Sequence, residues 1–244
     1  GAFAEVYDLS DALAPRYVGS LFGASVGFTV AARGNLVVVA SPNGDGVSLR
    51  TFDLRDPSAP EALWTLDVTS ESRLVNVAMG DGVVWFVRSP SDERAELVGM
   101  DLSTATRVPT IVSETVLAEP PRGGGVSRMS LVGAGLLLCG SLGEVDGLAI
   151  SARYFDVTTS SPLLRAAQST EACGLLVTPR RSVAAMRDDR GVPGIAFFDV
   201  TTPMAPIELG HAGHRGDVEH AAIVGDALLV SGTEGLLAFP LGCD

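Results

Sequence analysis

The sequence predicts an all-β fold, a β-propeller in which four-stranded sheets are arranged around a common axis. A motif of an aromatic residue or Met, then Asp, then Leu or Val recurs, and copies begin at residues 7, 52, 100, 155 and 198. A degenerate copy begins at Phe239, so neighbouring copies are 41 to 55 residues apart, the length of one four-stranded blade. Apolar residues also occur in short runs rather than with helical spacing.

The second copy shows how each unit divides into strands. We expect strands at residues 28–32, 36–40, 46–54 and 61–68, with Arg33-Gly34-Asn35 as a tight turn between the first two. The runs at 36–39, 83–87 and 136–139 are almost continuously apolar, which is typical of strands covered on both faces. Residues 161–169 are the best helix candidate, but they occur where an outer strand is expected.

Each motif Asp is predicted to accept a hydrogen bond from a nearby backbone N–H in an Asx-type turn. The Pro residues that follow fix φ and end the strand ladder before the chain reverses. We therefore assign these Asp residues a structural role rather than a catalytic one.

Residues 52–60 and 198–206 closely resemble the core of the LVIVD repeat, and the resemblance extends over essentially the whole chain. The copies at Met100 and Phe239 depart from that pattern. The resemblance implies a propeller of an exported bacterial protein, at an extracellular, periplasmic or cell-surface location, and it implies no catalytic residues. All 17 basic residues are Arg, which suggests a GC-rich bacterial host.

Gly1 lies six residues before its motif, as Gly46 does, and Gly194 and Gly235 lie four residues before theirs, each where a third strand is expected to begin. We therefore expect strands three and four of one unit, four full units and three more strands, which makes 21. We interpret residues 1–244 as one propeller domain with about five visible repeats. We hypothesise that upstream strands complete a ring of six or seven blades, whereas a native start at Gly1 would require five.

The formal charge of −12 excludes nucleic acid as the expected partner, because phosphate binding needs a basic surface. No apolar run approaches the ~20 residues of a membrane-spanning helix. Cys139, Cys173 and Cys243 lack the spacing of a zinc site. Cys139 and Cys173 fall in neighbouring units, where either a disulfide or two buried thiols would fit.

One face of the ring is predicted to carry tight turns, and the other is predicted to carry long loops rich in carboxylates. The acidic loops would bind a protein partner, such as a basic segment or another part of the same polypeptide, or cations. Alternatively, they only keep the ring soluble. The carboxylates expected there are Asp45, Glu71, Asp92, Glu93, Glu114, Glu119, Glu144, Asp146, Glu171, Asp188, Asp189, Asp217, Glu219 and Glu234.

All three histidines lie in one polar segment, which we expect to be the loop that enters the last inner strand. Imidazoles and carboxylates suit a metal, but HxxH in a glycine-containing loop fixes no ligand geometry, so no metal site is predicted. Residues 120–125 lack the features of a phosphate-binding loop, and no cofactor is predicted. The candidate partner-binding residues are Arg128, Asp188, Asp189, His211, His214, Arg215, Asp217, Glu219 and His220.

Propeller enzymes place their catalytic groups on the innermost strands, which we expect at residues 28–32, 74–79, 128–132, 173–177 and 218–224. Glu219 is the one acidic residue in those segments, whereas a glycosidase needs two carboxylates. A lactonase-like calcium site would have only Glu219 and Asn76. The sequence therefore favours a non-catalytic interaction or scaffold propeller. The alternative is a hydrolase at the channel mouth that uses Glu219, His220 and Arg128.

Overall fold

The computed structural model of the chain describes most of the predicted strands. The described residues are 2–11, 13–24, 29–44, 46–69, 76–80, 82–91, 94–102, 109–117, 126–132, 135–140, 144–145, 148–149, 152–159, 162–168, 176–177, 183–188, 194–199, 202, 207–213, 218–224, 227–232 and 235–240. These residues form antiparallel strands joined by turns, and they contain no helix. None of them forms a helix that is long and apolar enough to cross a membrane.

Six antiparallel sheets follow one another along the chain. The first sheet contains β1 (Ala2–Asp8) and β2 (Arg16–Ala24). The second contains β3 (Thr29–Arg33), β4 (Leu36–Asn43), β5 (Gly46–Asp53) and β6 (Glu61–Thr69). The third contains β7 (Val77–Met79), β8 (Val83–Ser91), β9 (Arg94–Asp101) and β10 (Thr110–Leu117).

The remaining sheets repeat the same meander. The fourth sheet contains β11 (Val126–Val132), β12 (Gly135–Gly140), β15 (Ala152–Asp156) and β16 (Leu163–Gln168). The fifth contains β17 (Leu176–Val177), β18 (Val183–Asp188), β19 (Gly194–Asp199) and β20 (Ile207–Gly213). The sixth contains β21 (Val218–Val224), β22 (Ala227–Gly232) and β23 (Gly235–Pro240). A separate hairpin, β13 (Glu144–Val145) with β14 (Leu148–Ala149), is inserted between β12 and β15.

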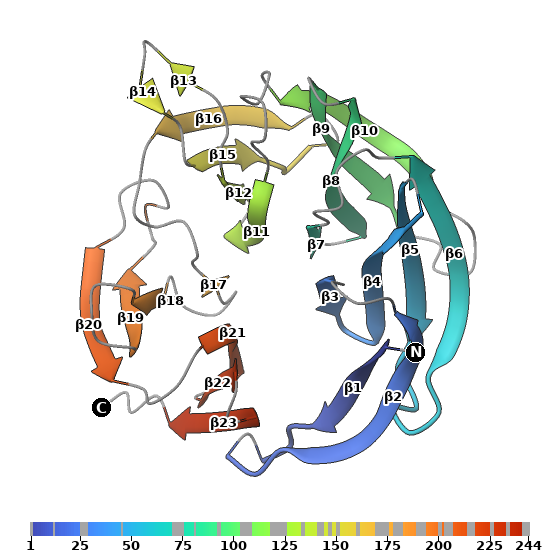
Figure 1. Cartoon of the computed structure of the whole chain (residues 1–244), viewed down its shortest axis with the longest axis vertical. Coiled ribbons are helices and arrows are strands. Elements are labelled where there is room, and N and C mark those ends of the chain that lie inside the picture. Colours follow the sequence, from blue (N-terminus) through green and yellow to red (C-terminus); the bar gives the residue numbers. More distant parts are fainter. Residues whose placement is uncertain are drawn as a thin grey trace.

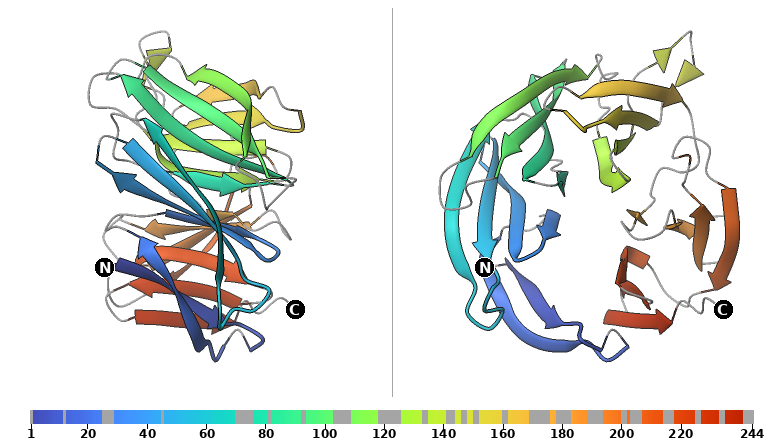
Figure 2. Two further views of the ribbon diagram at one scale, coloured as in Figure 1. Left: turned by 90° about the vertical axis from the view of Figure 1, so that its right-hand side faces the viewer. Right: turned by 180° about the vertical axis from the view of Figure 1, so that it is seen from behind.

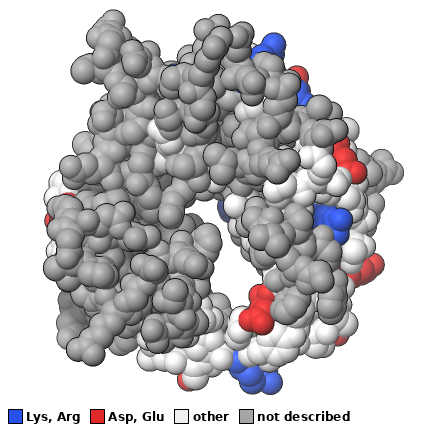
Figure 3. Space-filling view, in the orientation of Figure 1, with Lys and Arg blue, Asp and Glu red and all other residues white. Residues whose placement is uncertain are grey.

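The sheets are arranged around a ring, with β3, β7, β11, β17 and β21 nearest its centre and β6, β10, β16 and β20 on its outside (Figure 1). Figure 2 shows the ring from the side and from behind, and Figure 3 shows an opening near its middle. The all-β propeller is therefore confirmed. The six sheets together hold the 21 strands that the repeat predicts, and the β13–β14 hairpin is additional.

In the second and third sheets, one end of the repeat is held by short backbone hydrogen bonds. Gly34 and Gly82 have φ of 58° and 71°, a conformation that favours glycine in tight turns. The residue after the motif Asp then donates to the turn between the first two strands of its sheet. The Leu54 N–H donates to the Asn35 carbonyl, and the Leu102 N–H donates to the Gly82 carbonyl, both at 2.7 Å.

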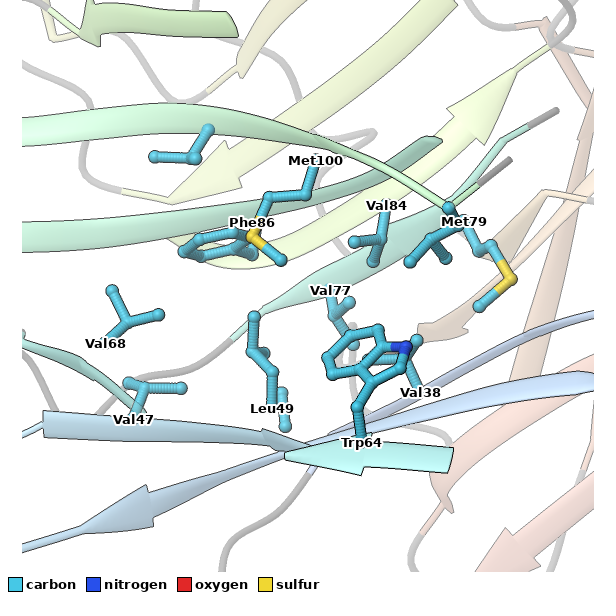
Figure 4. Close-up of a cluster of buried hydrophobic side chains, with 13 residues drawn as sticks. Val38, Val47, Leu49, Trp64, Val68, Val77, Met79, Val84, Phe86 and Met100 are labelled. Carbon is cyan, nitrogen blue, oxygen red and sulfur yellow. The ribbon is translucent and has the colours of Figure 1, made fainter. Parts of the chain in front are cut away.

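The core consists of apolar layers between neighbouring sheets. Between the second and third sheets, Val38 and Leu49 pack with Phe86, Met100 and other side chains (Figure 4). Between the third and fourth, Trp85 packs in a cluster that includes Leu136, and its ring lies over Gly99 of the paired strand. These side chains are fully or almost fully buried. Burial of such apolar surface is the main stabilising contribution to the ring.

Candidate functional site

The candidate partner-binding residues lie on several sheets. Arg128 lies in β11 opposite Cys139, and Asp188 lies in β18 opposite Gly194. Glu219 and His220 lie in the inner strand β21. His214, Arg215, Asp217 and Asp189 lie outside the described residues.

The prediction that the three histidines share one connecting loop needs a correction. His211 lies in the outer strand β20, where it pairs with Ala196. His220 lies in β21, the innermost strand of the next sheet, opposite Ser231. Backbone pairing extends β20 to Gly213, so the connection is shorter than its glycine-rich composition suggests. Among the residues that the structure describes, no group of three or more His, Cys, Asp or Glu side chains is placed to hold a metal ion.

A network of charged side chains lies at the loop-rich end of the third sheet. Arg88 Nε donates to Glu96 at 2.7 Å, and Arg88 Nη2 donates to Glu114 at 2.6 Å. Arg94 forms a second ion pair with Glu96. Burial raises the pKa of Glu96, but the hydrogen bond and charge of Arg88 outweigh it and lower this pKa overall. Glu114, expected in a loop, lies in β10.

This network reduces the negative charge that the sequence predicts for the loop-rich face. The side chain of Glu96 is 5% exposed and that of Arg88 is 22% exposed, so they neutralise each other in a largely desolvated position. Glu114 is likewise paired with Arg88. At this end of the third sheet, Glu96 and Glu114 are therefore balanced by guanidinium groups instead of adding to an acidic surface.

The turn that directly follows each motif Asp is called a corner here, and three corners share the same hydrogen bonds. Asp8 Oδ1 accepts from the Ser10 N–H at 2.9 Å, Asp53 Oδ1 from Arg55 at 2.8 Å, and Asp156 Oδ1 from Thr158 at 3.0 Å. The predicted Asx-type turns are confirmed at these corners. In each case the other carboxylate oxygen accepts from an arginine, which is Arg16, Arg55 or Arg165.

Hydrogen bonds to the carboxylate lower the pKa of Asp8 and of Asp156. The hydrogen bond from Arg16 lowers the pKa of Asp8 to about 2, with a further contribution from the Ser10 N–H. Hydrogen bonds from the Thr158 hydroxyl and from Arg165 hold the pKa of Asp156 well below its usual range. An ionised carboxylate bound by turn donors and by arginine cannot serve as a proton donor near neutral pH, which agrees with a structural role.

A pocket of about 630 Å³ lies where the first corner meets the second. Its walls are Tyr7, Asp8, Leu9, Arg16, Tyr17, Val18, Asp56, Pro57 and Ser58. The rings of Tyr7 and Tyr17 meet edge to face, with centroids 5.9 Å apart. The hydrogen bond to Glu5 raises the pKa of Tyr7, and the Ser58 hydroxyl lowers the pKa of Asp56.

The two sheets approach closely beside this pocket. A Cβ atom at Gly19 of β2 would lie 2.7 Å from the Pro57 carbonyl oxygen, so glycine permits the contact. The pocket carboxylates are already bound by Arg16 and by the turn donors of residue 58. We assign this pocket to the joint between repeats. No sequence pattern indicated it, because its walls come from two repeats.

Solved structures show what the fold resembles. The periplasmic gluconolactonase PpgL of Pseudomonas aeruginosa superposes with a TM-score of 0.63 at 10% identity, over 97% of this chain and 87% of that one. A Lactobacillus plantarum protein gives 0.62 at 15% identity, over 98% and 73%. TolB of Acinetobacter baumannii gives 0.53 at 12% identity, over 98% and 59%. At these identities the likeness supports the propeller fold alone.

No protein-family model matches the sequence, and no curated protein is similar to it in sequence. Membership of the LVIVD family is therefore not confirmed. The propeller fold itself is supported by the sheets and by the similar structures.

Proposed function

We propose that this chain is a non-catalytic propeller that binds another protein. The observation that carries the proposal is the exposure of large aliphatic side chains on the outer strands of three consecutive sheets. These side chains are Ile111, Val112 and Val116 of β10, Leu163 and Leu164 of β16, and Ile207 and Leu209 of β20.

Apolar exposure is high on these strands. Ile207 is 66% exposed and Leu209 is 59% exposed, whereas β6, the outer strand of the second sheet, exposes no large hydrophobic side chain. Extended apolar patches on a soluble protein mark interaction sites. Each of β10, β16 and β20 is also the last described strand of its sheet, so an extended segment of a partner can pair with its backbone.

The loop-rich face is the alternative surface at which a partner protein would bind. The candidate residues from Arg128 to His220 and the acidic loops support it from the sequence. The neutralised carboxylates of the third sheet weaken it there. An exported location remains part of the proposal, supported by the repeat pattern and by the likeness to a periplasmic protein.

Site-specific photo-crosslinking in the native host tests the proposal. A photoreactive residue is introduced at Ile207, at the exposed Thr65 of β6 as a matched control, or at Asp67 near the loop-rich end. We expect one discrete crosslinked protein from position 207 and none from position 65. Crosslinking from position 67 alone would move the partner to the loop-rich face. Equal yields from 207 and 65 would contradict the proposed surface.

The hydrolase alternative rests on Glu219 and His220, which both lie on the inner strand β21, and on Arg128 of the inner strand β11. The resemblance to a gluconolactonase makes lactones and esters the compounds to screen. Turnover that is lost in Glu219→Gln, with the fold retained, would favour this alternative over the binding proposal.

A further inference from the structure

The first sheet differs from the other five on the side that faces the ring axis. In the second to sixth sheets, the strand that carries the motif pairs with a neighbour on its axis side, as β5 pairs with β4 and β9 with β8. The corresponding strand of the first sheet, β1, pairs with β2 alone among the described strands. Figure 1 shows no described strand between β1 and the centre of the ring.

This difference leaves apolar surface uncovered on the second sheet. Val30 of β3 pairs with Val39 and faces the first sheet, and it is 45% exposed. The corresponding side chains of the third sheet, Val77 and Met79, face the second sheet and are 7% and 8% exposed. Val77 and Met79 are covered because the second sheet has inner strands beside them. Val30 is open because no inner strand of the first sheet is described.

The apolar layers between sheets show the same difference. The layer between the second and third sheets includes inner-strand residues, among them Val77 and Met79 of β7 and Ala31 of β3. The layer between the first and second sheets contains Leu21, Val37, Val39 and Phe52, with Ala4, Val6 and Leu54 against it, and no residue of β3. The interface between these two sheets therefore stops before it reaches the axis.

Two buried polar atoms on this side of the second sheet also lack partners. Ser48 Oγ and Arg50 Nε are buried without a hydrogen-bond partner. Ser48 is 1% exposed and pairs with Ser41, while Arg50 pairs with Val39 of the layer that faces the first sheet. Buried polar groups are normally hydrogen-bonded, so the layer between these two sheets is incompletely satisfied. Thr51 Oγ1 and Trp64 Nε1 are unpaired in the same way on the other side of the second sheet, so the docking site rests on the open edge of β1 and on Val30.

We propose that the axis side of the first sheet is a docking site for one β-hairpin, which pairs with β1 and covers Val30. The expected hairpin resembles the inner pairs of the other sheets, such as β3 with β4, with nearly continuous apolar strands and a tight turn. All described strands of this chain already belong to sheets, and so would those of a second copy. The proposed occupant is therefore a hairpin other than these described strands, supplied by a partner polypeptide.

Strand addition explains why such a site exists. An isolated two-stranded sheet is only marginally stable, and pairing at its open edge adds backbone hydrogen bonds and apolar cover together. The outer strands of the third to fifth sheets, which carry the proposed partner surface, are not involved. Failure of one proposal is therefore distinguishable from failure of the other.

A grafted hairpin tests the docking site. A second copy of residues 29–45 is placed directly before Gly1, so that Gly1 takes the place of Gly46 in the repeat. We expect the melting temperature to rise by about 5 °C or more, and amide exchange in β1 to slow at least tenfold. A graft of the same composition in scrambled order is the control.

Substitutions within the resident chain make the test specific. Val30→Asp should change the melting temperature little in the ungrafted protein, where Val30 is exposed, but should remove most of the gain in the grafted protein. Val116→Asp, at another exposed valine, should leave the gain intact. An unchanged gain in Val30→Asp, or no gain from the graft, would overturn the proposal.

A measurement in trans covers the case in which the graft prevents folding. A synthetic peptide of residues 29–45 is added to the ungrafted chain, and amide exchange in β1 is followed. Protection of β1 that Val30→Asp abolishes supports the site, and the absence of protection refutes it. A dimer of the ungrafted chain that buries Val30, seen by light scattering and by exchange, would show that a second copy is the occupant instead.

Discussion

Replacement of Gly99 by alanine tests whether the ring depends on close packing of aromatic rings over glycine. A Cβ at this position would lie 2.6 Å from Cζ3 and 2.8 Å from Cη2 of Trp85. Favourable carbon–carbon contacts are about 3.5–4.0 Å, so the indole must move by roughly 1 Å. Trp85 is 2% exposed and is held in the layer between the third and fourth sheets, so such a movement disturbs that layer.

The expected cost is that of overpacking a core, about 1–3 kcal/mol. Gly210→Ala is the matched control, because Gly210 also lies in a strand but has no atom within 4 Å of its Cβ position. At about 2–4 °C per kcal/mol for a chain of this size, Gly99→Ala should melt about 2–12 °C below Gly210→Ala. Scanning calorimetry of both variants measures the difference.

A double-mutant cycle assigns the cost to the indole. In a Trp85→Leu background the larger ring is gone, so Gly99→Ala should cost much less than it does in the wild-type chain. The proposed clash between Gly99 and Trp85 is wrong if Gly99→Ala and Gly210→Ala have the same melting temperature. It is also wrong if Gly99→Ala costs the same in the wild-type and Trp85→Leu backgrounds.

Two further predictions concern ionised side chains. Because the pKa of Asp8 is lowered to about 2, its stabilising contribution is complete above its unfolded-state pKa of about 3.9 and is lost as pH falls through 2. Arg16→Gln should raise the pKa of Asp8 in a carbon-13 NMR titration, and an unchanged value would show that Arg16 is not the cause. Glu96→Ala should lower the free energy of unfolding in urea by about 1–3 kcal/mol, because Arg88 loses its buried acceptor. Arg94→Ala, at an exposed arginine, should cost less than about 1 kcal/mol, and equal costs would contradict this assignment.

The repeat period and the apolar runs predict most of the fold because both are local properties of the chain. The predicted strand at residues 36–40 extends as far as Asn43, although Ser41-Pro42-Asn43 has the composition of a turn. Pairing with β5 through Asn43 and Gly46 outweighs that local preference. The β13–β14 hairpin was not predicted, since its strands contain only two residues each.

The candidate site was harder to predict, because its contacts join separate parts of the chain. The partner of Asp8 is eight residues away in β2, and that of Asp156 is nine residues away in β16, so no fixed spacing marks them. Arg88 and Glu114 are 26 residues apart and come together only when β8, β9 and β10 pair. For the same reason, composition alone placed His211 in a loop.

The hydrogen bonds from Leu54 to Asn35 and from Leu102 to Gly82 connect the strands at one rim of the second and third sheets. The opposite rim, where the second and third strands of each repeat are connected, tolerates inserted residues. The β13–β14 hairpin lies on that opposite rim, yet β12 and β15 keep continuous pairing from Gly135–Asp156 to Cys139–Ala152. Insertions at the connection between the second and third strands of a repeat therefore leave its sheet intact. This rim is the natural place to graft new binding loops onto the scaffold.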